Sequence, residues 1–295
     1  MHDVIIIGGG FAGLAAATQL GRARRGVLVL DTGKPRNRFA DRSYGFLTRD
    51  GEPPLAMLAE ARRQLAAYET VAIRSAEAVA ANQIEGGFDI ELDGGDRVRG
   101  RRLILAHGVV DEADMLPGME ACWGRTVFFC PYCHGFEVAD RRLGLLLRNG
   151  DALDLARFYR EWTADFTLFT NGAPVDDGVR QALGDMGVPI VEDTVIRLEH
   201  EDGALRAVVT ASGPMPLDAL FTHPPTHFAS NIGEQLGCET KEAALGPFYV
   251  VDHQQETSVA GVYAAGDIAR PAPSVSYAVA DGAAAGIFAH GSLVG

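Results

Sequence analysis

The chain has 295 residues, 47% of them hydrophobic, which is enough for two α/β domains of ordinary size with their own cores. The formal net charge of −13, without a basic run, argues against partners such as nucleic acid or an anionic membrane surface. The first residues offer no charged stretch followed by a long apolar core, so we expect neither a signal peptide nor a membrane span, and a cytoplasmic protein.

An apolar, β-branched run at residues 4–7 leads directly into a glycine-rich turn and an Ala- and Leu-rich helix predicted over 14–22. Gly8, Gly10 and Gly13 match the GxGxxG pattern in its strand–turn–helix context. This pattern gives a tight turn, close approach of the main chain to a pyrophosphate, and close packing of helix on strand. The next predicted strand, 27–30, ends in Asp31, whose carboxylate can bind a ribose diol or, alternatively, cap the strand end.

Residues 33–51 are rich in turn formers, and a long loop of this kind usually covers a ligand. Beyond it we predict a helix over 54–68, then strands at 71–73, 88–92 and 97–99 as a small meander. A further buried strand begins at residue 103 and ends at a glycine. We interpret His107, at the end of this strand, as structural.

The second half of the chain repeats the alternation of strands and helices. The sequence changes character at 115–118, which we take as a domain boundary. Predicted elements follow at 143–147, 152–162, 166–169, 179–186 and 188–191, with further strands at 195–200, 205–210 and 219–222. One dinucleotide-binding plan is therefore predicted to occur twice.

The C-terminal segment returns to the pattern of the first domain. A strand at 248–251 and an apolar run ending in Gly266-Asp267 precede a small-residue helix over 276–289. Asp267 would lie where a carboxylate can bind a ribityl hydroxyl, with a solvated turn residue as the alternative. The helix after it would offer its positive N-terminal end to an electron-rich ring.

The sequence Cys130-Pro131-Tyr132-Cys133-His134-Gly135 places two thiols one helical turn apart, and a helix N-terminus stabilises a thiolate. A structural zinc site needs four ligands, usually from two such pairs, and Cys122 and Cys238 form no second pair. Glutaredoxins share the Cys-Pro-Tyr-Cys motif but open a small fold with it. We predict a redox-active pair at Cys130 and Cys133, core thiols at the other two cysteines, and no metal site.

These motifs, in this order, resemble the low-molecular-weight thioredoxin reductase family over essentially the whole chain. The resemblance implies an α/β fold of two Rossmann-like dinucleotide-binding domains, each a three-layer ββα arrangement, the second inserted in the first. It implies a discontinuous FAD-binding domain at 1–114 and 245–295, an NADPH-type domain at 115–244 that carries the CxxC, and a homodimer. The residues it implies for FAD are Gly8, Gly10, Phe11, Ala12, Gly13, Asp31, Thr32, Asn37, Gly45, Phe46, Ala106, Gly108, Gly266, Asp267, Tyr277 and Ala278.

The second nucleotide site departs from the family pattern. The GxGxxA positions that seat NADPH would fall on Leu147, Asn149 and Ala152. The next strand ends in Thr170-Asn171-Gly172, without paired arginines for a 2′-phosphate or an acid that would favour NAD. Two missing charge-assisted contacts, at about 1.5–3 kcal/mol each, lower the affinity roughly 10²–10⁴-fold. We predict that this site is degenerate.

His134 is the second departure, because thioredoxin reductases carry an acidic aspartate after the second cysteine. The motif is similar to that of the flavin dithiol oxidases of the gliotoxin and holomycin type, which pass electrons from a dithiol through FAD to oxygen. We expect an FAD-dependent thiol/disulfide oxidoreductase that cycles the Cys130 and Cys133 disulfide without NADPH. His134 would move the proton in catalysis, or alternatively only pack.

Three alternative functions remain open. The chain could be an NADPH-dependent thioredoxin or disulfide reductase, a ferredoxin-dependent one, or a non-enzymatic FAD redox sensor. The expected partner is a small dithiol or disulfide, or a thioredoxin-like protein. His223 and His227 are expected on a loop, where surface or interdomain packing is the predicted role.

Overall fold

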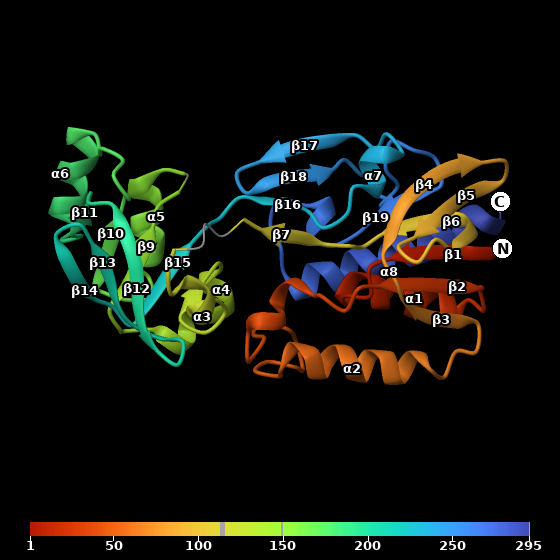
Figure 1. Cartoon of the computed structure of the whole chain (residues 1–295), viewed down its shortest axis with the longest axis horizontal. Coiled ribbons are helices and arrows are strands. Elements are labelled where there is room, and N and C mark those ends of the chain that lie inside the picture. The colour runs from red at the N-terminus through yellow and green to blue at the C-terminus, as the bar shows by residue number, and fades with distance from the viewer. Residues whose placement is uncertain (113–115, 149, 295) are drawn as a thin grey trace. The chain divides into compact units, whose positions relative to one another are not determined.

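The computed structural model describes residues 1–112, 116–148 and 150–294 (Figure 1). Its contacts divide the chain into two compact units. Unit 1 comprises Met1–Arg38, Pro54–Asp111 and Thr226–Gly295, and unit 2 comprises Phe39–Pro53 and Glu112–Pro225. Among the helices of the described ranges, none is long and apolar enough to cross a membrane.

These units divide the chain differently from the predicted domains. Residues 226–244, predicted in the inserted domain, belong to unit 1, where Gln235 of α7 (Ile232–Gln235) hydrogen-bonds the main chain of β4 (Ala78–Ile84). Residues 39–53, predicted in the FAD-binding domain, belong to unit 2. The predicted junction between residues 114 and 115 lies outside the described residues.

Unit 1 is built on a seven-stranded sheet in the order β3-β2-β1-β6-β5-β4, with β19 also paired to β6. The C-terminal half of β6 pairs in parallel with β1 and β19, and its N-terminal half pairs antiparallel with β5. The strands are β1 (His2–Ile7), β2 (Val27–Asp31), β3 (Val71–Ser75), β5 (Gly87–Leu92), β6 (Arg97–Leu105) and β19 (Val262–Ala264).

The strand predicted at 71–73 is confirmed as β3, but two other predictions about this sheet, the make-up of the meander and the division of β6, are wrong. The strand predicted at 71–73 is a parallel neighbour of β2, so the meander consists of β4, β5 and β6, and β4 was missed. The strand predicted at 97–99 and the one predicted to begin at residue 103 are one strand, β6. Arg97 and Arg99 in its first half bond to Asp89 of β5, so this half is polar and resembles a separate element in the sequence.

Side chains of β1 alternate between two cores because successive residues of a strand face opposite ways. Val4 and Ile6 pack with the helices α1 (Phe11–Arg22), α2 (Pro54–Leu65) and α8 (Val275–Val294). Ile5 and Ile7 pack on the other face with β5, α7 and β18 (Gly246–Tyr249), which pairs with β17 (Thr240–Ala243). This three-layer arrangement confirms the predicted fold class.

Helices α1 and α8 lie against each other in unit 1 (Figure 1). A Cβ at Gly282 of α8 would lie 2.0 Å from the Ala12 carbonyl oxygen of α1. Only glycine allows the two main chains to approach so closely. The small residues of the predicted C-terminal helix therefore allow α8 to pack directly against α1, the helix that follows the first glycine turn.

Unit 2 repeats the plan with a parallel sheet in the order β11-β10-β9-β15-β8. One face packs on the helices α5 (Ala152–Tyr159) and α6 (Asp177–Asp185), and the other on a three-stranded antiparallel sheet, β12-β13-β14. The bounds are β8 (Val127–Phe128), β9 (Leu143–Leu146), β10 (Phe166–Phe169), β11 (Ile190–Val191), β12 (Val195–Glu201), β13 (Ala204–Thr210), β14 (Gly213–Pro216) and β15 (Ala219–Thr222). The predicted second βαβαβ is confirmed.

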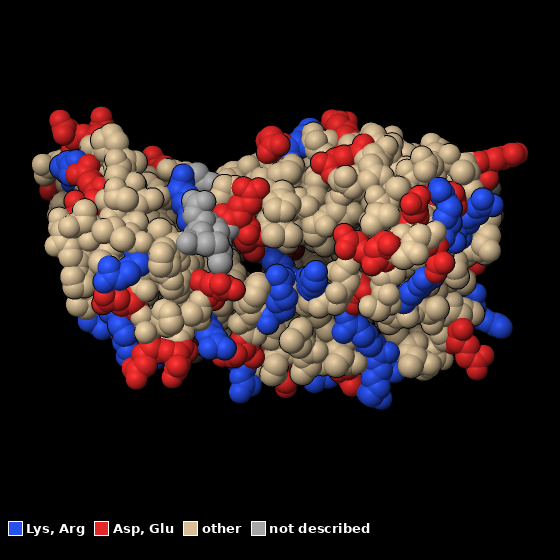
Figure 2. All heavy atoms as spheres, in the orientation of Figure 1, with Lys and Arg blue, Asp and Glu red and all other residues tan. Residues whose placement is uncertain are grey.

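Acidic and basic side chains are interspersed on the face shown in Figure 2. Several basic residues are paired, as Arg63 is with Glu60 and Arg142 with Asp218, both at 2.6 Å. Such exposed pairs add little stability, typically about 0–1 kcal/mol. This face therefore does not resemble the basic surface that nucleic acids require.

Candidate functional site

The glycine turn of unit 1 connects β1 to α1, as the GxGxxG pattern predicts. Gly8 has φ +111°, and a Cβ there would lie 2.2 Å from the Ala106 carbonyl oxygen. Gly10 is the N-cap of α1 and provides no side-chain cap, and a Cβ built on it has no atom within 4 Å. The first turn of α1 thus has no side-chain cap and open space beside Gly10, which fits a pyrophosphate.

Asp31 lies beside this turn at the end of β2. Its carboxylate accepts hydrogen bonds from the Gly9 and Gly33 N–H groups at 3.3 and 3.0 Å, and Arg62 of α2 lies 2.7 Å away as an ion-pair partner. Arg62 also donates to the Gly9 carbonyl oxygen at 3.2 Å. This guanidinium, which was not predicted as part of the site, thus joins α2 to the predicted ribose-binding carboxylate.

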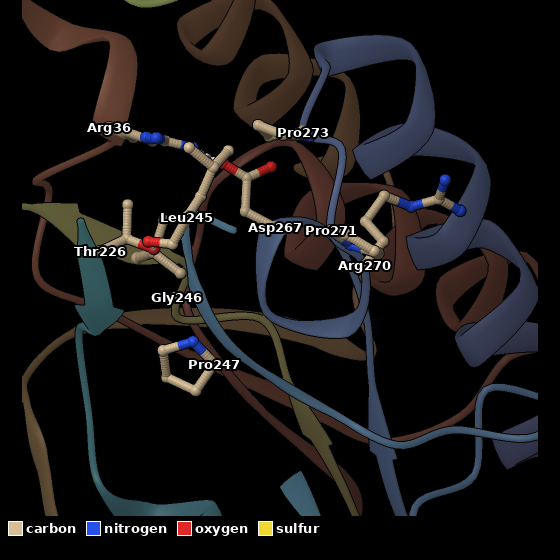
Figure 3. A pocket seen from close by; sticks show the side chains of 10 residues that line it. Arg36, Thr226, Leu245, Gly246, Pro247, Asp267, Arg270, Pro271 and Pro273 are labelled. Carbon is tan, nitrogen blue, oxygen red and sulfur yellow. Dashed lines mark hydrogen bonds and ion pairs between the residues drawn. The ribbon is translucent and has the colours of Figure 1, made fainter. Parts of the chain in front are cut away.

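Asp267 begins the short helix η3 (Asp267–Ala269), separated by two residues from the end of β19. The Arg36 guanidinium binds it at 3.0 Å and also binds Asp111 at 2.5 Å, and Figure 3 shows Arg36 directed toward Asp267. Burial raises the pKa of Asp267, and the Arg36 charge opposes that rise. Arg36 was not predicted as a site residue. Its partners are remote in sequence, and the turn-forming residues around it indicate a loop without pointing to any one side chain.

The start of α8 completes this part of unit 1. Ser274 accepts a hydrogen bond from the Tyr277 N–H at 3.0 Å and so caps the helix, while Arg270 lies over the Tyr277 ring at 4.3 Å. Arg270 is held by two hydrogen bonds to Asp281, at 2.6 and 2.7 Å. A small cavity of about 20 Å³ beside Asp267 has room for one water (Figure 3).

The predicted FAD residues fall in both units. Gly45 and Phe46 belong to the segment 39–53 of unit 2, where the Gly45 N–H donates to Asp50 at 2.8 Å. The others lie in unit 1: Gly8, Gly10, Phe11, Ala12, Gly13, Asp31, Thr32, Asn37, Ala106, Gly108, Gly266, Asp267, Tyr277 and Ala278. Their roles toward FAD stay predictions.

The dithiol follows the carboxyl end of β8. Cys130 is the N-cap of α4 (Pro131–His134), and the Cys133 N–H donates to its carbonyl oxygen at 3.2 Å, so both thiols belong to one turn. Both are partly exposed, whereas Cys122 and Cys238 are buried and burial raises their pKa values. The prediction that Cys122 and Cys238 are core thiols is confirmed.

His134 is the last residue of α4. Its ring stacks on Phe128 with centroids 4.4 Å apart and makes an edge contact with Tyr44 at 5.9 Å. Burial lowers the pKa of His134 to about 4, against a hydrogen bond with the Arg42 main chain that raises it. His134 is therefore neutral near pH 7 in this conformation, and its part in proton transfer stays a prediction.

Two further titratable groups lie in the same part of unit 2. Tyr159, at the end of α5, has its hydroxyl 2.9 Å from Nε2 of His223, which follows β15. His223 is partly buried there, as the predicted packing role requires. The expectation that His227 lies on a loop is wrong, because it is part of β16 (Thr226–Phe228), whose hydrogen bonds to β7 (Val109–Asp111) order this segment.

The position in unit 2 that corresponds to the glycine turn has a different structure. Asp151 is the N-cap of α5, and its carboxylate accepts hydrogen bonds from the Leu153 and Asp154 N–H groups, both at 2.9 Å. Leu147 packs against the core of unit 2. Asn149, the other predicted departure from the fingerprint, lies outside the described residues.

Residues 2–282 match the model of the family described as pyridine nucleotide-disulphide oxidoreductase. The chain belongs to this family. The family is one of FAD-binding flavoproteins, so the predicted resemblance, the oxidoreductase activity and the FAD cofactor are confirmed.

Relatives in this family match nearly the whole chain. Thioredoxin reductase tcpT of Claviceps purpurea is 31% identical, over 99% of this chain and 94% of its own. The solved structure of an oxidoreductase from Agrobacterium tumefaciens is 41% identical with a TM-score of 0.93, covering 99% of this chain and 98% of that chain. The structure of HlmI is 36% identical with a TM-score of 0.91, covering 99% and 92%. The chain is thus an FAD-type disulfide oxidoreductase of the thioredoxin reductase fold.

Proposed function

We propose that this enzyme oxidises a dithiol at Cys130 and Cys133 without using NADPH, with oxygen as the final electron acceptor. The observation that carries the nicotinamide-independent part is the carboxylate of Asp151 on the N-terminus of α5. The choice of oxygen is supported by the resemblance of the Cys-Pro-Tyr-Cys-His-Gly motif to the dithiol oxidases.

A dinucleotide site of this fold binds its pyrophosphate with the N–H groups at the start of the helix after the first strand. In unit 2 the Asp151 carboxylate already accepts from two of these groups. A pyrophosphate would have to displace it and would meet its negative charge. Losing two such bonds, at about 1.5–3 kcal/mol each, weakens binding roughly 10²–10⁴-fold.

The edge of the same site supports this proposal. Leu147 places an apolar side chain, packed on the core, where the fingerprint has its first glycine. At the end of β10 the Asn171 side chain accepts a hydrogen bond from the Val195 N–H at 2.8 Å. The side-chain oxygen of Asn171 is therefore already hydrogen-bonded to the protein's own main chain.

The residues of unit 1 suit FAD as the resident cofactor. The open N-terminus of α1 would hold the pyrophosphate, Asp31 the ribose, and Asp267 a ribityl hydroxyl. Bound FAD supplies the two-electron acceptor that returns the dithiol to the disulfide and hands the electrons on to oxygen.

The dithiol chemistry can be written with the protein's own sulfurs. A substrate thiolate attacks Sγ of Cys130, and the bond between Cys130 and Cys133 breaks with its electron pair on Cys133. The second substrate thiol loses its proton and attacks the substrate sulfur of this mixed disulfide, which releases Cys130 as a thiolate. The substrate leaves as a disulfide, and the cysteine pair has gained its two electrons.

The surroundings of the dithiol favour a small apolar dithiol or disulfide as the partner over a highly charged one. Tyr132 and Phe136, on either side of Cys133 in sequence, are 76% and 85% exposed. Aromatic surface of this size gains free energy when an apolar ligand covers it. A thioredoxin-like protein is the alternative partner, and a homodimer is proposed from the resemblance.

Oxygen uptake with dithiothreitol tests the assignment of the cysteines. We expect Cys133→Ser and Cys130→Ser each to lose at least about 100-fold in uptake, because each removes one sulfur of the exchange. Cys130→Ser should keep a long-wavelength thiolate-to-flavin absorbance band. Cys238→Ala, at a buried thiol of unit 1, is the matched control and should retain turnover. Unchanged uptake in both serine variants would refute the proposal.

A reductase that receives electrons from ferredoxin is a second candidate, since the capped α5 suits it equally well. The two candidates differ in what reduces the bound FAD. Reduction by a ferredoxin system but not by small dithiols would favour the reductase. Reduction by dithiols with uptake of oxygen would favour the oxidase.

A further inference from the structure

One guanidinium joins three segments of unit 1 that are far apart in the sequence. Arg36 begins the short helix η1 (Arg36–Phe39), Asp111 ends β7, and Asp267 begins η3. Each of the three side chains is at most 20% exposed. Charges so far removed from water need a partner, because an uncompensated buried charge is costly. Both carboxylates therefore depend on this one cation.

The two carboxylates use the guanidinium in different ways. Asp111 binds it with both oxygens, since Nε of Arg36 donates to Oδ2 at 3.0 Å and Nη2 donates to Oδ1 at 2.5 Å. Asp267 accepts a single hydrogen bond, from Nη1 to Oδ2 at 3.0 Å. A bidentate pair fixes the plane of a guanidinium. Asp111 thus fixes the direction from which Nη1 meets Asp267.

This arrangement leaves one oxygen of Asp267 available. Within the described ranges, the Asp267 carboxylate accepts one hydrogen bond, and that bond uses Oδ2. Figure 3 shows Asp267 among the residues that line a cavity of about 20 Å³. Oδ1 can therefore accept a hydrogen bond from a ligand without any loss of the ion pair with Arg36.

The charge of the cluster indicates which ligand group fits. Two carboxylates share one guanidinium, so a negative charge is left over. Arg270 does not supply the missing positive charge, because it donates two hydrogen bonds to Asp281, at 2.6 and 2.7 Å. An excess of negative charge attracts hydrogen-bond donors and repels anions. Hydroxyl groups therefore suit Asp267, and phosphate groups do not.

We propose that Arg36, held in place by Asp111, positions the Asp267 carboxylate to bind the ribityl hydroxyls of FAD. Arg36 acts through Asp267 and is a positioning residue rather than a ligand of FAD. Its charge also keeps the carboxylate ionised, and an ionised acceptor forms the stronger hydrogen bond. This inference rests on the part that the proposed function gives to Asp267, and it adds the two residues that hold this side chain.

The rate at which FAD leaves the loaded enzyme tests this inference and needs no turnover. Dilution of the purified enzyme, followed by the rise of flavin fluorescence, measures this rate. We expect Arg36→Met and Asp267→Asn each to accelerate release about 10- to 100-fold, because each weakens the same charge-assisted contact. The double variant should release FAD about as fast as the faster single variant, since Arg36 acts through Asp267.

Two other arginines provide the comparison. Arg62→Met removes the cation bound to Asp31, at the predicted adenosine ribose. Because this end of the site is separate, any acceleration by Arg62→Met should multiply with that of Asp267→Asn. Arg63→Met removes an exposed pair with Glu60 and should leave the release of FAD unchanged.

Thermal unfolding checks that each variant is folded. Where Arg36→Met alone is unstable, Arg36→Met with Asp111→Asn removes the carboxylate that would be left unpaired, and the same cycle with Asp267→Asn can be measured. Unchanged release in Arg36→Met or Asp267→Asn, or accelerations by these two changes that multiply, would overturn the inference. Failure of the proposed function would appear instead as reduction of the flavin by NADPH, which leaves these release rates as they are.

Discussion

Helices α1 and α5 occupy equivalent places in the two units, each after the first strand of a βαβ segment, yet they begin in opposite ways. Gly10 leaves the first N–H groups of α1 without a side-chain cap, whereas Asp151 covers those of α5 with a carboxylate. The same topology therefore presents an anion site in one unit and a self-capped helix in the other. On the proposed function, side-chain chemistry at the N-cap, rather than the fold, would decide which of the two sites takes a nucleotide.

The substitution Gly10→Asp would give α1 a carboxylate at its N-cap, like the one that Asp151 gives α5. A Cβ at Gly10 has no atom within 4 Å, so the fold should tolerate the change. The carboxylate would cap α1 and repel the pyrophosphate, and we expect FAD affinity to fall roughly 10²–10⁴-fold.

Flavin content and FAD titration of the purified variant measure this effect. Gly10→Asn, which has nearly the same size without the charge, is the matched control and should lose clearly less. Equal losses in both variants would show that space, rather than charge, excludes the anion.

Two partly buried carboxylates of unit 1, Asp111 and Asp267, share one cation. Arg36→Met leaves Asp267 and Asp111 without the guanidinium that binds both, and we expect it to cost about 3 kcal/mol in the free energy of unfolding. Urea unfolding measures the loss. Arg63→Met, which removes an exposed pair with Glu60, is the comparison and should cost below about 1 kcal/mol.

Each unit contains one histidine whose pKa burial lowers to about 4: His107 in unit 1 and His134 in unit 2. The unfolded chain, with histidine pKa values near 6.5, binds more protons between these values. Stability should therefore fall as the pH is lowered from about 6.5 to 4, by about 2 kcal/mol per histidine at pH 5.

Urea midpoints at pH 7.5 and pH 5 test this dependence. His134→Asn should remove part of the difference between the two midpoints, and the exposed His253→Asn should not. A pH difference that is the same in both variants would contradict the assignment to His134.

The smallest effect is expected at the capped helix. Asp151→Ala removes both cap hydrogen bonds and should lower stability by about 1 kcal/mol, measured by urea unfolding. Asp154→Ala, an exposed change on the same helix, is the control. Because Leu147 would still be packed in the second site, we expect that Asp151→Ala alone does not allow NADPH to reduce the flavin measurably.

Local patterns made much of the site predictable. The glycines of the first turn and the Cys130 and Cys133 pair depend on spacings of a few residues, and the structure places them on the expected strand, turn and helix. The strand β6 was divided in the prediction because its polar half is stabilised by ion pairs to β5, which periodicity does not reveal.

Partners distant in sequence could not be predicted. Arg36 and Asp111 are 75 residues apart, Arg62 and Asp31 are 31 apart, and Tyr159 and His223 are 64 apart. Each pair forms only when strands and helices pack, so no local spacing signals it. Asp151 is different: an aspartate directly before a predicted helix is an N-cap signal, and it could have been recognised from the sequence.

The central claim is that the dithiol, rather than a nicotinamide, delivers electrons to FAD. Anaerobic addition of NADPH or NADH to the yellow enzyme, followed by dithiothreitol, tests it through the flavin absorbance. We predict no bleaching with either nicotinamide and prompt bleaching with the dithiol. Prompt bleaching by NADPH would contradict the account.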